Sequence, residues 1–179
     1  MVTTYTPDSQ MLASAVLVTR MVFGLLMAAH GAQKLFGWFG GYGLNATGEF
    51  LVQLGFPPGR LFAAEAALGE CGGGLLVALG FLGPVGPALM ISVMIVAMIS
   101  VHRANGLFAA SNGIELPLLY ATGALGMALA GPGPFSLDAL LGITPVWTPA
   151  VTWAVLAAGV VGAIVNLTIR RRTVPAQGS

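Results

Sequence analysis

Six side chains that can bind ligands or transfer protons lie near the ends of long apolar runs in this 179-residue chain. They are His30, Lys34, Glu65, His102, Asn112 and Glu115. Imidazole and ammonium groups donate hydrogen bonds and carboxylates exchange protons, so such a set can hold a polar ligand. His30 and Lys34 are four residues apart, which places both on one face of a helix. We therefore expect a polar chamber to which several helices contribute.

Two further charges, Arg20 and Glu70, lie near the middle of apolar runs. A charge at that depth in a membrane costs several kcal/mol unless it faces the protein interior and finds a partner. We expect the two runs to be antiparallel neighbours, so that Arg20 and Glu70 form a structural ion pair. A proton relay is the alternative interpretation of this pair.

The composition indicates a membrane protein. Hydrophobic residues make up 56% of the chain and charged residues 7%, and the mean hydropathy is +0.89. A chain of this size with so little polar surface must face lipid. The basic cluster Arg170 to Arg172 suits an anionic membrane surface better than nucleic acid, for which we expect no role. The lone Cys71 excludes a disulfide within one chain, and we expect it to be a packing residue.

Five segments approach the roughly 20 apolar residues that a spanning helix needs. They lie at about 11–31, 60–82, 84–102, 115–131 and 150–169. The expected fold is all-α: a four-helix transmembrane bundle, a fifth transmembrane helix, and a short interfacial helix between the first two spans. We expect that interfacial helix to start after Asn45 or Thr47. We also expect a loop with one capped turn near Ser136.

Basic residues predict the orientation. With five spans and a cytoplasmic C-terminus, the basic residues outside the middle of the spans all fall on the cytoplasmic side. These residues are Lys34, Arg60, Arg103 and Arg170 to Arg172. We therefore expect a multi-pass protein of the plasma (inner) membrane with its N-terminus outside.

Four motifs, taken in order, resemble the DoxX family of small membrane proteins over about residues 11–142. They are His30–Gly37, Glu65–Gly74, Asn112–Glu115 and Gly131–Asp138. The family pattern usually has an arginine and then an aromatic residue before Ser136–Asp138. This chain has Pro134 in place of the arginine, followed by the aromatic Phe135. Because members of the family typically have four helices, the resemblance implies a DoxX-like domain over 1–142. Residues 143–179 then form an additional helix with a basic tail.

The resemblance implies a place in a membrane redox assembly, as an accessory subunit with other membrane or peripheral subunits and lipids as partners. The chamber of His30, Lys34, Glu65, His102, Asn112 and Glu115 could bind a quinone head group. His30 and His102 could instead supply two axial haem ligands. We expect no metal-ion site and assign no catalytic residue. The alternatives are a non-catalytic anchoring subunit and a carrier of small solutes or protons.

Overall fold

The computed structural model describes residues 7–171 of the chain. Arg172, the last member of the basic cluster, and the tail that follows it lie outside this range. The described residues form helices and turns without a β-strand. The α-helices are α1 (Pro7–Phe36), α2 (Gly43–Gln53), α3 (Gly59–Leu79), α4 (Val85–Ala97), α5 (Glu115–Ala130), α6 (Leu137–Leu140) and α7 (Pro149–Ile169).

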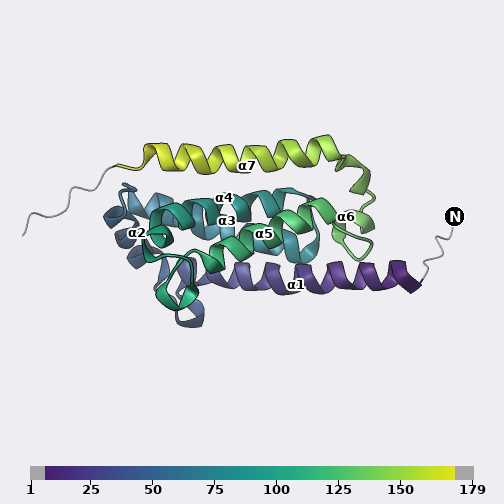
Figure 1. The fold of residues 1–179 in the computed structure, drawn as a ribbon, viewed down its shortest axis with the longest axis horizontal. Coiled ribbons are helices and arrows are strands. Elements are labelled where there is room, and N and C mark those ends of the chain that lie inside the picture. Colours follow the sequence, from purple (N-terminus) through teal and green to yellow (C-terminus); the bar gives the residue numbers. More distant parts are fainter. Residues whose placement is uncertain (1–6, 172–179) are drawn as a thin grey trace, which may run out of the picture.

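Five long helices run side by side along the molecule, and each reverses the direction of the one before it (Figure 1). Helix α1 lies along one edge of the bundle and α7 along the opposite edge, with α3, α4 and α5 between them. The short helices α2 and α6 lie at opposite ends. We call these ends the α2 end and the α6 end. The predicted bundle of four helices with a fifth beside it is confirmed.

The core lies where α1, α3, α4, α5 and α7 face one another. Met27, Met90 and Ala124 are completely buried there, and Leu156 brings α7 into the same apolar cluster. Helix α7 comes close to α4 at Gly159, where a Cβ atom would lie 2.6 Å from the Ala88 carbonyl oxygen. The fifth helix is therefore part of the packed bundle.

Four helical segments are long and apolar enough to cross a membrane: α1, α3, α7 and the continuous stretch Val85–Asn105. The remaining expected span, at about 115–131, is α5, which is an apolar helix of 16 residues. At 1.5 Å per residue it is about 24 Å long, shorter than a bilayer core of about 30 Å. Pro117 lies in its first turn, and Gly131 ends it with a positive φ of 78°.

Glycines allow the backbones of α1 and α3 to touch. A Cβ atom at Gly74 would lie 2.5 Å from the Ala28 nitrogen, and one at Gly31 would lie 2.3 Å from the Cys71 nitrogen. Cys71 therefore packs against α1 at this crossing, in agreement with its expected role. Helices that approach this closely need small residues at the contact.

One of the two local expectations differs from the structure, and the other is confirmed. Helix α2 begins at Gly43, before Asn45 and Thr47, and no side chain caps it. The capped turn is present: Ser136 Oγ accepts a hydrogen bond of 3.1 Å from the Ala139 nitrogen at the start of α6.

We predict that Gly74→Ala destabilises the protein, while Gly72→Ala does not. A methyl group at position 74 collides with the α1 backbone, whereas nothing lies within 4 Å of a Cβ atom at position 72. Overpacking at position 74 should cost about 1–3 kcal/mol. The measurement is the temperature at which the detergent-solubilised protein stops eluting as a single species in size-exclusion chromatography. Equal midpoints for the two variants would contradict the assigned helix contact.

Candidate binding cavity at the α2 end

A cavity of about 330 Å³ opens between α1, α2, α3, α4 and α5 at the α2 end. Most of its wall is apolar, including Phe50 of α2, Phe56 after it, and Val93 and Val96 of α4. Seven polar side chains also line it: His30, Lys34, Thr47, Glu70, Ser100, His102 and Tyr120. An apolar cavity with a few convergent polar groups is the usual form of a small-molecule site.

Lys34 and Glu70 form an ion pair at this cavity. The Glu70 side chain is 3% exposed, while that of Lys34 is 33% exposed. Lysine can extend its apolar stem along the helix surface and still bring its ammonium group to a buried partner. The pair places a proton-exchanging carboxylate beside a hydrogen-bond donor within one cavity.

The predicted ion pair between Arg20 and Glu70 is wrong. Arg20 precedes Lys34 by fourteen residues, which is about 21 Å along α1. The antiparallel contact with α3 places Arg20 beside Gly80, at the far end of the bundle from Lys34. Arg20 Nη2 instead donates a hydrogen bond of 2.5 Å to the Phe135 carbonyl oxygen. Sequence spacing gave the depth of each charge in its own run but not the register between the two helices.

A π-helical turn at Met98–His102 continues α4 beside the cavity. Its residues Ser100, Val101 and His102 all line the wall. Ser100 Oγ is buried and has no hydrogen-bond partner. Single π-helical turns within α-helices are frequent at functional sites because they redirect the side chains that follow. This turn brings an unpaired hydroxyl group and an imidazole to the cavity from one element.

Both histidines are oriented by a hydrogen bond at Nδ1. His102 Nδ1 lies 2.8 Å from the Asn112 carbonyl oxygen, and His30 Nδ1 lies 3.2 Å from Gln33 Oε1. Because both partners are oxygen acceptors, both Nδ1 atoms donate. In a neutral ring Nε2 is then the acceptor.

Tyr120 is a cavity residue that the sequence analysis missed, as are Thr47 and Ser100. Its ring meets His30 edge to face, with the centroids 5.7 Å apart. It also interacts electrostatically with Glu70. Tyr120 is the only tyrosine within an expected span, and a phenol in an apolar helix usually has a polar partner. That feature could have identified it.

Three residues of the expected chamber do not line the cavity. Glu65 accepts a hydrogen bond of 2.6 Å from Asn166 Nδ2 of α7. It precedes Glu70 by five residues, about 140° around the helix, so the two carboxylates face different neighbours. Asn112 contributes only its backbone carbonyl to His102. Glu115 Oε2 accepts a hydrogen bond of 2.7 Å from the Ala109 nitrogen and so stabilises the loop before α5.

The sequence model of the DoxX family matches residues 15–103. Residues 15–103 belong to the DoxX family. The DoxX segment supplies every polar cavity residue except Tyr120, including the π-helical turn. It ends before Asn112–Glu115 and Gly131–Asp138, two of the four motifs in the resemblance. No curated protein and no solved structure matches the chain.

The chain that contains this DoxX segment is a multi-pass membrane protein with transmembrane helices. Within the DoxX segment, α1 and α3 provide Lys34 and Glu70, while α4 and its π-helical turn provide Ser100 and His102. Helices α5 and α7 lie outside the segment, yet α5 closes the cavity with Tyr120. The cavity therefore depends on a helix that follows the matched segment.

We predict that Lys34→Met destabilises the protein more than the double variant Lys34→Met/Glu70→Gln. The single change leaves the buried Glu70 carboxylate without its partner, at a cost of roughly 1–3 kcal/mol. The double change removes the charge as well, which offsets most of that loss.

The measurement is thermal stability in detergent for wild type and all variants of the double-mutant cycle. Arg60→Met is the control, because Arg60 is an exposed residue near the same end of the bundle, and it should change stability by less than about 0.5 kcal/mol. If the double variant were no more stable than Lys34→Met, the assigned ion pair would be contradicted.

Proposed function

We propose that this DoxX protein is a membrane subunit of a redox complex and binds a quinone head group in the cavity at the α2 end. The observation that carries the proposal is the set of polar groups in one apolar-walled cavity: the Lys34–Glu70 pair, both histidines, Tyr120 and the unpaired Ser100 hydroxyl. The volume of about 330 Å³ lies at the lower end of the range of about 300–1,000 Å³ for ligand sites.

The donor and acceptor inventory suits a quinone. When bound, a quinone supplies transfer of two electrons and two protons. Lys34 has ammonium protons to donate to a carbonyl oxygen, and Glu70 holds a proton-exchanging carboxylate at the same wall. The Nε2 atoms of His30 and His102 can accept from the hydroxyl groups of the reduced form. Phe50, Phe56 and Val96 provide apolar surface for the ring.

The test is mass spectrometry of an organic-solvent extract of the protein purified in detergent, with quinone quantified per chain. We expect a near-equimolar quinone in wild type and its loss in Glu70→Gln and His102→Ala. Glu65→Gln is the matched control, because Glu65 is on the same helix but faces α7. An empty wild-type extract, or equal loss in the Glu65 and Glu70 variants, would contradict the proposal.

Haem is the second candidate, because His30 and His102 line the same cavity and both use Nδ1 for a protein hydrogen bond. Metal-bound histidines commonly have this arrangement, with the second ring nitrogen oriented by the protein. An absorption spectrum of the purified protein distinguishes the two cofactors. A haem Soret band that disappears in both His30→Ala and His102→Ala would assign haem in place of quinone.

The alternative of a non-catalytic anchoring subunit makes a different prediction for the same variants. In that case the polar cluster only stabilises the bundle, and the exposed side of α7 with Trp153, Val161 and Ile164 contacts a partner. Changes at Glu70 or His102 would then lower protein yield or complex assembly. Under the quinone proposal they lower quinone content in a complex that still assembles.

We further propose that the α2 end faces the cytoplasm. The described basic residues other than Arg20 all belong to segments at this end: Lys34, Arg60, Arg103, Arg170 and Arg171. Short basic segments beside spans are retained in the cytoplasm. A fluorescent protein fused after Ser179 should fluoresce, and alkaline phosphatase fused there should be inactive. The opposite result would place the cavity and the C-terminus outside.

A further inference from the structure

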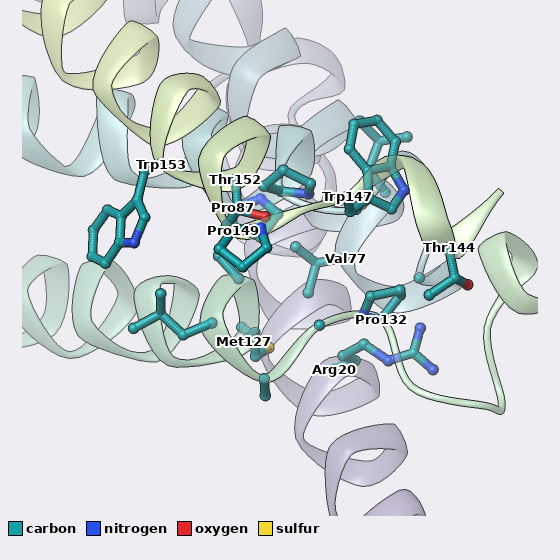
Figure 2. A pocket seen from close by; sticks show the side chains of 18 residues that line it. Arg20, Val77, Pro87, Met127, Pro132, Thr144, Trp147, Pro149, Thr152 and Trp153 are labelled. Atoms are coloured by element: carbon teal, nitrogen blue, oxygen red, sulfur yellow. The ribbon is translucent and has the colours of Figure 1, made fainter.

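A second cavity, of about 290 Å³, lies at the α6 end, far along the bundle from the first. Arg20 of α1, Gly80 at the end of α3 and Pro132 after α5 line it, together with Trp147 and Trp153 near the start of α7. In Figure 2 the Arg20 guanidinium and the Trp147 indole lie on the same side of this cavity, and Trp153 lies on the opposite side. None of these residues contributes to the cavity at the α2 end.

Arg20 is buried without enough partners. It is 3% exposed, and only its Nη2 atom has a hydrogen bond, to the Phe135 carbonyl oxygen. Its Nε and Nη1 atoms are buried and have no partner, and Trp147 Nε1 is in the same situation. A buried donor without an acceptor is costly, and more so when it is charged. These three unpaired atoms are all donors, and both residues line the same cavity.

Asp138 does not satisfy these donors. It is fully buried, and its Oδ1 and Oδ2 atoms accept hydrogen bonds of 2.8 Å and 2.7 Å from the Leu82 and Gly83 nitrogens. Its carboxylate interacts electrostatically with Arg20, but both of its oxygens accept hydrogen bonds from the turn between α3 and α4. The negative charge offsets part of the Arg20 charge. A ligand that completes the site must therefore supply oxygen acceptors and carry a small negative charge.

We propose that this cavity binds a phosphate oxyanion, with Arg20 and Trp147 as the donors. A guanidinium binds phosphate oxygens through paired N–H groups, and the indole N–H adds a third, neutral donor. The partial compensation by Asp138 suits a singly charged phosphodiester, as in a phospholipid head group, better than a doubly charged phosphate. The exposed side chains of Leu129 and Trp153 at the same cavity provide apolar surface for an acyl chain.

The experiment follows the indole N–H signals by nitrogen-15 NMR of the full chain in maltoside detergent, which carries no phosphate. The three tryptophans, Trp38, Trp147 and Trp153, are assigned by replacing each with phenylalanine. Inorganic phosphate and a short-chain phosphatidylglycerol are titrated separately against sodium chloride of equal ionic strength. We expect the Trp147 signal to move downfield with saturation, while the Trp38 signal stays in place.

Calorimetric titration of the same ligands measures the affinity of the variants. Arg20→Gln should weaken binding tenfold or more, because a charged donor pair is lost. Trp147→Phe keeps an aromatic ring but loses the indole N–H, and it should weaken binding about three- to tenfold. This variant tests the site independently if Arg20→Gln does not fold. Trp38→Phe is the matched control, because it changes the same residue type at the α2 end, away from this cavity. It should bind as wild type does.

A response to inorganic phosphate assigns a site for a free anion, and a response to phosphatidylglycerol alone assigns a lipid head-group site; both support the proposal. No response to either ligand overturns it, and so does binding that Arg20→Gln and Trp147→Phe leave unchanged. The quinone content of the α2-end cavity is measured separately, so failure of one site is distinguishable from failure of the other.

Discussion

The close antiparallel contact between α1 and α3 is the constraint on which both cavities depend. At Gly24, Gly31 and Gly74 the two backbones leave no space for a side chain. A shift of one residue along either helix would bring a larger side chain into these contacts. The contact therefore fixes one register, in which Lys34 meets Glu70 at one end and Arg20 lies beside Gly80 at the other. Backbone contact between small residues is effective in a membrane because lipid provides little hydrophobic force between helices.

The two ends of the bundle have different polar chemistry. At the α2 end an ammonium and a carboxylate already pair with each other, and imidazole and hydroxyl groups complete the cavity wall. At the α6 end the unpaired buried atoms are the donors of Arg20 and Trp147, while the Asp138 oxygens are used by a turn. The first arrangement suits a ligand that exchanges protons, and the second suits an anion.

Helix α7 connects these two ends. Trp147 and Trp153, near its start, line the cavity at the α6 end. Beyond its last residue, Arg170 Nε donates a hydrogen bond of 2.6 Å to the Leu54 carbonyl oxygen, and the Arg171 nitrogen donates one of 2.7 Å to Gly55. Glu65 joins α3 to Asn166 of the same helix. Glu65, which the residue pattern assigned to a binding chamber, thus forms a hydrogen bond that holds α7 against the bundle.

The sequence by itself determined the all-α membrane fold, the number of long apolar helices and the crowding of basic residues at one end, because hydropathy and charge act over whole segments. It also identified His30, Lys34 and His102, since polar residues at the ends of apolar helices are conspicuous. The partner of Glu70, the different directions of Glu65 and Glu70, and the place of Tyr120 were decided only by the tertiary structure. In a membrane helix both lipid-facing and core-facing residues are apolar, so rotation and register leave little trace in the pattern. They depend on which small residues meet across the α1–α3 contact.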